Sequence, residues 1–353
     1  MSIGAIGRLD TGAAMLRARL EVLTRQVSDG RQGPGYGDIA PEARRAVDLR
    51  AELVRREVWQ GTISRTLART SAAQHTLGRI ADIATQFYQE AIRLDGTSGV
   101  RIAAVATAAR AAMVEVASLL NERHAGVHLF GGSDSANPPI PDAQGIPGSG
   151  MATSIAAAVG GLTAGNAAAV AAATLAAAQS DAAGTTPFSA FVSDPARGLG
   201  EPRRSVPAAD GERVAHGLFA NRNAAATSTG ETTGSWARDV LRGLATLAAL
   251  DPAQGALGTG FTELMAVVRG GLRSAVDAIG VERGALGATE QRLETTARRH
   301  AEVSVALAAQ LAGIEEVDMA ATISRMQATR TQLEASYRAI SLVSGLTLTR
   351  FLA

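Results

Sequence analysis

Residues 9–27 read LDTGAAMLRARLEVLTRQV, and this stretch near the start of the chain decides the fold. Six of its apolar residues follow one another in alternating steps of four and three residues. This spacing places them all on one side of a helix, as in the seam of a coiled coil. The residues of this predicted seam are Leu9, Ala13, Leu16, Leu20, Leu23 and Val27.

A second stretch with the same period lies near the other end, where residues 319–344 read MAATISRMQATRTQLEASYRAISLVS. Its apolar members are Met319, Ile323, Met326, Leu333, Tyr337 and Ile340, with Arg330 and Ser344 as polar exceptions at the same spacing. Soluble proteins rarely leave a continuous apolar stripe in water. We therefore expect the two terminal helices to pair. Further apolar residues, among them Ile3, Ile6, Leu342, Val343, Leu346 and Leu348, predict contacts with other copies of the chain.

Between the two ends, the sequence predicts long helices around an inserted region rich in Gly, Pro, Ser and Thr. The expected helices cover 41–94, 100–123, 236–250 and 261–312, and the expected short strands cover 127–130, 188–192 and 212–219. The fold class is mainly α: paired terminal helices and an elongated helical bundle, with a mixed, β-containing outer domain. The predicted domains are a terminal assembly domain (1–37 and 313–353), a helical shaft (38–135 and 235–312) and an inserted outer domain (136–234).

Composition excludes several classes of function. The 353 residues carry a net charge of +1, all the Lys+Arg residues are Arg, and there is no Cys. The chain therefore lacks a P-loop lysine, a thiol nucleophile, a disulfide and a Cys-ligated zinc site. The near-zero charge argues against nucleic acid as a partner. The N-terminus has no apolar signal-peptide core, and the alanine-rich stretch 155–178, interrupted by Gly and Asn, is too weak for a membrane span.

The polar candidates for chemistry all have simpler explanations. His124 and His128 have the spacing of a helical metal pair, but Gly126 between them indicates a helix end. The acidic cluster 315–318 precedes a helix, where carboxylates commonly act as caps. The GPGYG segment 33–37 is interpreted as a flexible hinge, because it does not lie between a strand and a helix. We predict no catalytic, cofactor or metal site, and no enzyme activity.

Several segments resemble the bacterial flagellin and hook-associated family. At the N-terminal end these are QVSDGR (26–31) and NERHAGVHLFGG (121–132); at the C-terminal end they are IEEVDMA (314–320), TQLEASY (331–337) and LTLTRFL (346–352). The resemblance covers about the first 135 and the last 115 residues. Three features depart from the family pattern: Asp29, the segment GPGYGDIAPEA (33–43) and His128.

Within the family, the C-terminal segments, above all 331–337, are most similar to the hook–filament junction protein, the third hook-associated protein. This resemblance implies a subunit exported to the flagellum without a cleaved signal peptide and held by an export chaperone through its C-terminal region. It also implies a homo-oligomeric ring between the hook-side junction protein and flagellin. No cofactor is implied. Two other functions remain open: flagellin itself, and a cytoplasmic helical signalling or adaptor protein.

Overall fold

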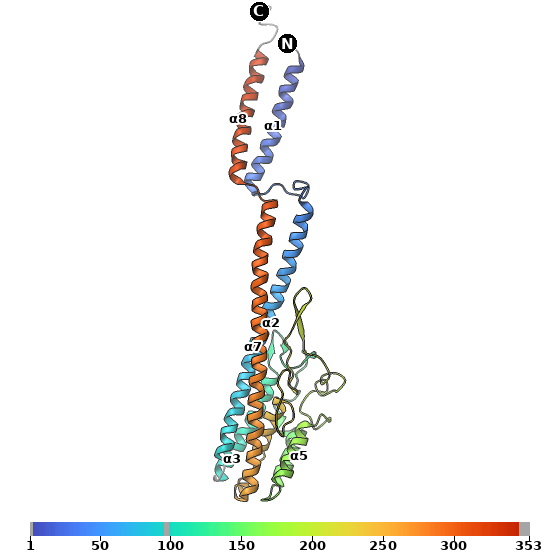
Figure 1. The fold of residues 1–353 in the computed structure, drawn as a ribbon, viewed down its shortest axis with the longest axis vertical. Coiled ribbons are helices and arrows are strands. Elements are labelled where there is room, and N and C mark those ends of the chain that lie inside the picture. The colour runs from blue at the N-terminus through green and yellow to red at the C-terminus, as the bar shows by residue number, and fades with distance from the viewer. Residues whose placement is uncertain (1–2, 95–98, 346–353) are drawn as a thin grey trace, which may run out of the picture. The chain divides into compact units, whose positions relative to one another are not determined.

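A computed structural model describes residues 3–94 and 99–345, and it is mainly helical (Figure 1). The α-helices are α1 (Ile3–Asp29), α2 (Ala43–Arg93), α3 (Gly99–Leu120), α4 (Gly150–Gly160), α5 (Ala167–Gln179), α6 (Trp236–Ala248), α7 (Thr259–Glu315) and α8 (Met319–Gly345). Two 3₁₀ helices, η1 (Ile146–Gly148) and η2 (Pro252–Leu257), directly precede α4 and α7. Two antiparallel hairpins, β1 (Arg123–His124) with β2 (Val127–His128) and β3 (Ser205–Ala209) with β4 (Glu212–Ala215), complete the described elements.

The chain divides into two compact units, 1–58 with 299–353 and 59–298. The first unit contains α1, α8, the start of α2 and the end of α7. Its α2–α7 part has a small apolar core made of Ile39, Ala46, Leu49 and Ile314. This core is too small to bury both faces of any of its helices, so apolar residues remain on the surface of this unit.

The second unit holds one large apolar core shared by α2, α3, α6 and α7, and by the inserted segments that pack on them. Helix α3 is long and apolar enough to cross a membrane by length and composition alone. Its residues Ile102, Met113, Val116 and Leu120 are nevertheless buried against the rest of the unit. Such burial is typical of the central helix of a packed protein, which passes the same composition test.

The mainly helical fold class and the paired terminal helices are confirmed, with helix ends within a few residues of those expected for the long helices. The expected strand at 188–192 is wrong, because this segment forms turns. The strand expected at 212–219 ends at Ala215, and the one expected at 127–130 ends at His128. The apolar residues Leu346 and Leu348, which were expected to contact other copies, lie outside the described residues.

The alanine-rich part of the inserted region, for which no helix was predicted, forms the helices α4 and α5, which pack against each other and against α6. Gly160 ends α4, and Gly161 and Gly165 lie between the two helices. Alanine favours this arrangement, because it forms helices well and its small side chain lets helices approach closely. Ser149 begins α4 as an N-cap, and its hydroxyl accepts a hydrogen bond from the Ala152 amide.

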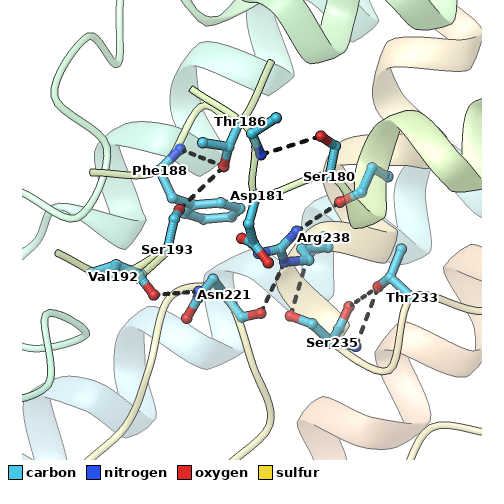
Figure 2. Close-up of polar contacts among 12 residues, drawn as sticks. Ser180, Asp181, Thr186, Phe188, Val192, Ser193, Asn221, Thr233, Ser235 and Arg238 are labelled. Carbon is cyan, nitrogen blue, oxygen red and sulfur yellow. Dashed lines mark hydrogen bonds and ion pairs between the residues drawn. The ribbon is translucent and has the colours of Figure 1, made fainter. Parts of the chain in front are cut away.

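Helix α6 is buried along its whole length, including its charged residues. Figure 2 shows how Arg238 is satisfied there: its Nε donates to the Asn221 carbonyl at 3.0 Å and its Nη1 donates to the Ala178 carbonyl at 2.9 Å. Its Nη2 forms an ion pair with Asp181, and its guanidinium lies 5.1 Å from the Phe188 ring centre. A buried guanidinium is tolerated only when its donors are paired, so Arg238 ties three segments of the inserted region to α6.

Two further buried charged residues, Arg242 and Glu282, hold neighbouring segments in place in the same way. Arg242 donates to Thr174 Oγ1 at 3.1 Å and to the Ala171 carbonyl at 2.9 Å, which joins α6 to α5. Glu282 on α7 is fully buried, and its Oε1 accepts three backbone amides from residues 224–226 at 2.6, 2.8 and 3.0 Å. Three amides directed at one oxygen are a strong anion cradle. The turns of residues 221–235 are therefore held by side chains from two helices.

Asp239 gives this buried network a pH dependence. Burial raises the pKa of Asp239 from 3.8 to about 6, against the opposing effect of its hydrogen bond from the Thr233 amide. The folded chain therefore binds this proton more tightly than the unfolded chain does. The contribution of Asp239 to stability falls as the pH rises from about 4 to 6, by up to about 3 kcal/mol.

Asp239→Asn should remove this part of the pH dependence, because the amide stays neutral and its oxygen can still accept the Thr233 N–H. The measurement is the free energy of unfolding by urea between pH 4 and 7. The control is Asp277→Asn, whose carboxylate is exposed and pairs with Arg273. An Asp239→Asn profile parallel to that of the unmodified chain would contradict the assignment.

Candidate assembly surface

Helices α1 and α8 pack against each other as an antiparallel pair within the first unit (Figure 1). On α1, all the predicted seam residues lie on the less exposed side of the helix. Ala13 and Leu23 are buried, and the half-buried positions are Leu9, Leu16, Leu20 and Val27. The apolar period of the N-terminal sequence thus marks the side of α1 that contacts α8.

On α8, the predicted residues divide between two sides. Leu333 is buried, and Met326 and Ile340 are half-buried. Met319, Ile323 and Tyr337 are instead exposed, with 40, 36 and 38% of their surface accessible. The pairing side of α8 shares Met326, Leu333 and Ile340 with the predicted seam, but it has different residues between them. Its members are Thr322, Met326, Thr329, Leu333, Ser336 and Ile340.

Sequence reasoning missed Thr322 and Thr329, both 3% exposed, because counting only apolar residues passes over threonine. The Thr329 hydroxyl donates to the Arg325 carbonyl at 2.8 Å, so its polar atom is satisfied within its own helix. A step of four residues back from Met326, and another from Leu333, would have identified both threonines. Small residues at these positions allow the two helices to approach closely.

A pair of helices covers only one side of each partner, and apolar residues remain outside it. Met15 and Val22, seven residues apart, are 65 and 46% exposed on α1, and Leu342 is 71% exposed on α8. These residues, together with Met319, Ile323 and Tyr337, are named here the outer stripe; Tyr337 contacts Arg17 of α1 but is still 38% exposed. Apolar surface that one chain leaves uncovered on long helices is typical of a protein interaction site.

Two side-chain contacts support the register of the pair. The guanidinium of Arg17 lies 5.0 Å from the Tyr337 ring centre and donates to the Tyr337 hydroxyl. The Thr24 hydroxyl lies 3.9 Å from the sulfur of Met326. Both contacts join residues some 300 positions apart in the sequence. An Arg stacked on an aromatic ring adds about 0.5–1 kcal/mol at an exposed site, so packing remains the main attraction.

Backbone hydrogen bonds close the pair at its inner end. The Val317 amide donates to the Gly30 carbonyl at 3.0 Å, and the Gln32 amide donates to the Glu315 carbonyl at 2.8 Å. Gly30 has a φ of +69°, the left-handed conformation that favours glycine after a helix. A short antiparallel bridge between residues 30–32 and 315–317 therefore directly precedes the segment 33–37 that was predicted to be a flexible hinge.

The rest of this connecting segment is held against α2 and the end of α7. Arg50 of α2 forms an ion pair with Glu315 at 2.7 Å and donates to the Tyr36 hydroxyl at 2.9 Å. The hydrogen bond to Glu315 raises the pKa of Arg50. Asp38 Oδ2 accepts the Gly35 amide at 3.0 Å. A cleft of about 420 Å³ lies beside the segment and carries charges of both signs, from Arg25, Asp29, Arg31 and Asp38.

The polar residues considered for chemistry have structural roles. His124 and His128 lie on the two strands of the β1–β2 hairpin, and His128 Nδ1 lies 2.7 Å from the Asn121 carbonyl. Asp318 caps α8, since its Oδ1 accepts the Ala321 amide at 3.0 Å, as expected for the acidic cluster. Within residues 3–94 and 99–345 there is no group of three or more His, Asp or Glu arranged to hold a metal.

The comparison with known families bears on the C-terminal part of this surface. Residues 270–352, which include all of α8, match the family model of the bacterial flagellin C-terminal helical region. This match supports the bacterial flagellin family. Flagellins are structural proteins that self-assemble into the flagellum outside the cell. No curated protein matches the chain. Helix α8, which pairs with α1, therefore lies within the part of the chain that is similar to the flagellin C-terminal region.

Gly33 offers a test of the connecting segment. A Cβ added at Gly33 would lie 2.2 Å from Asp38 Cγ, whereas one added at Gly35 would have Asp38 Oδ2 as its nearest atom, at 3.9 Å. Gly33→Ala should therefore displace Asp38 and break its hydrogen bond to the Gly35 amide, at a cost of about 1 kcal/mol or more.

The measurement is amide hydrogen exchange across residues 30–42. Gly33→Ala should speed exchange at Gly35 and its neighbours, and the matched variant Gly35→Ala should leave exchange elsewhere in the segment close to that of the unmodified chain. Equal effects of the two variants would show that the Asp38 contact does not order this segment.

Proposed function

We propose that this chain is a structural subunit of the bacterial flagellum that forms the junction between hook and filament. It assembles as a homo-oligomeric ring through α1 and α8, with the hook-side junction protein on one side and flagellin on the other. An export chaperone binds its C-terminal region before export, and the chain reaches the flagellum without a cleaved signal peptide. The segments 1–37 and 313–353 form the assembly part of this subunit.

The observation that supports the proposal is the outer stripe on a pair of helices whose C-terminal member matches the flagellin family. The pairing sides of α1 and α8 bury each other's apolar residues, so the outer stripe is available to neighbouring copies. Burying a large apolar side chain stabilises an interface by about 1.5–3 kcal/mol. Several such side chains on each subunit supply enough free energy for assembly without any ligand.

A junction role is favoured over a filament role by the segment TQLEASY (331–337), which resembles the hook–filament junction protein. In the structure this segment contributes Leu333 to the pairing side of α8 and Tyr337 to the outer stripe. It therefore lies where a change of sequence would alter the contact with a neighbouring subunit. Flagellin itself is the alternative, because the match over 270–352 does not distinguish the two kinds of subunit.

The outer stripe can be tested with substitutions that leave the pairing side of α8 unchanged. In Met319→Ser combined with Ile323→Ser, two partly exposed apolar residues are lost, and the α1–α8 pair should keep its thermal stability within a few degrees. Incorporation should fall about tenfold or more, since each residue contributes burial only in the assembly. The measurement is the fraction of the protein recovered in sheared flagella relative to the culture supernatant.

Val281→Ser is the control, because Val281 is also exposed, at 53%, and lies on α7 in the second unit. It should be incorporated as well as the unmodified chain. Normal incorporation of the double variant would remove the stripe from the proposed assembly surface.

Antibody labelling of intact flagella separates the junction role from the two alternatives. A single labelled band at the hook–filament boundary is expected, and deletion of the gene should release filament protein into the medium. Label along the whole filament, with no filament protein after deletion, would identify flagellin instead. Protein found only in the cytosol would favour a helical adaptor and reject both flagellar roles.

A further inference from the structure

Four basic side chains gather at the base of the β3–β4 hairpin in the second unit. Arg203 and Arg204 immediately precede β3, and His216 immediately follows β4. In the hairpin, Ser205 pairs with Ala215, and the His216 amide donates to the Arg204 carbonyl at 2.8 Å, which sets these two residues opposite each other. The fourth is Arg69 of α2, whose charge acts on both His216 and Arg204.

The hairpin meets α2 through a small apolar contact, which brings the basic residues to the helix. Val214 of β4 is buried with Ile63 of α2 and Leu293 of α7. His216 lies two residues beyond Val214 and therefore on the same face of the strand. Arg69 lies further along α2 from Ile63, and its Nη2 donates to the His128 carbonyl at 2.8 Å.

Several hydrogen-bonding atoms of this group are buried and have no partner within the described residues. They are His216 Nδ1, Arg203 Nη2 and Arg204 Nη1. His216 itself is 8% exposed. The hydrogen bonds that the group does make go to neutral carbonyls: Arg203 Nε donates to the Gly217 carbonyl at 3.1 Å, as Arg69 does to His128.

Within the part of the chain that the structure describes, the charges that act on the pKa of His216 are all those of arginines. Burial, and then the positive charges of Arg69, Arg204 and Arg203, lower the pKa of His216 to about 4, against a backbone contact with Val214 that raises it. Two acidic residues close to the basic group in sequence, Glu201 and Glu212, are engaged elsewhere. Glu201 Oε1 accepts the Ser133 amide at 2.9 Å, and Glu212 forms an ion pair with Arg292 at 2.7 Å.

Guanidinium groups of like charge that are partly buried and keep unpaired donors destabilise a fold unless an anion joins them. We propose that Arg69, Arg203, Arg204 and His216 bind a small tetrahedral oxyanion of the phosphate or sulfate class. Guanidinium groups suit this ligand, because their planar N–H donors match phosphate oxygens in pairs. A tetrahedral ion also has oxygens that point in several directions. It can therefore accept hydrogen bonds from donors at the ends of two strands and on α2 at the same time.

A bound oxyanion would fasten the hairpin to α2 at a place where the apolar contact is small. The site is separate from the assembly surface, and it would act on the stability of the inserted region. Inorganic phosphate is the probe, and the full-length chain is titrated with it in an isothermal calorimeter at pH 7 and constant ionic strength. One ion per chain is expected to bind.

Arg204→Gln should weaken this binding about tenfold or more, because one charged donor is lost. In chloride buffer the same variant should unfold at the same temperature as the unmodified chain or higher, since a like-charge contact is removed. His216→Gln, on the opposite strand, gives a second measure should Arg204→Gln fail to fold. Its affinity for phosphate should also fall.

Arg273→Gln is the control, because Arg273 is exposed and pairs with Asp277 on α7. Phosphate stabilises folded proteins generally by exclusion from their surface, so the general effect must be separated from binding. The melting temperature of each variant is therefore compared between phosphate and chloride buffer. The general effect should raise it equally in all variants. The additional increase that comes from bound phosphate should be lost in Arg204→Gln and kept in Arg273→Gln. No measurable binding, or equal binding to both arginine variants, would overturn the proposal.

Discussion

The two backbone hydrogen bonds between residues 30–32 and 315–317 fix the register on which the paired terminal helices depend. A seam with one apolar residue every three or four positions permits slippage by a heptad, because each heptad offers similar side chains. The bridge removes that freedom, since it sets α1 and α8 in register at the point where both leave the rest of the unit. The contacts of Arg17 with Tyr337 and of Thr24 with Met326 then follow from this starting point.

Periodicity predicted the terminal helices well and the sides on which they meet only in part. On α1 the predicted residues and the pairing side coincide, because an apolar residue stands at each step of that side. On α8, half of the residues on the pairing side are threonine or serine. The prediction from apolar residues alone therefore included Met319, Ile323 and Tyr337, which belong to the outer stripe. The candidate surface was thus predicted as one seam, whereas the structure separates a side that pairs within the chain from a side that remains exposed. A count that admits threonine would have distinguished them.

The inserted region was least predictable, for a physical reason. Alanine-rich runs carry little periodic signal, so α4 and α5 could not be told from irregular chain. Helix α6 has arginines and an aspartate on the side opposite its apolar residues, and such a pattern ordinarily marks a surface helix. Here that polar side is also buried, because Arg238 and Arg242 donate to carbonyl groups of α5 and of Asn221, which are distant in the sequence. Partners of this kind are set by the tertiary fold and leave no local pattern in the sequence.

The outer stripe has members on both helices of the pair, and this bears on the symmetry of any assembly that it builds. Met15 and Val22 belong to α1, whereas Met319 and Ile323 belong to α8, so one patch of a subunit can meet a different patch of the next. Contacts of this heterologous kind close into a ring when the rotation between neighbours divides a full circle, and continue as a helical filament when it does not. A ring and a filament can therefore be built from the same paired helices, and a few side chains that set the angle between patches decide which one forms.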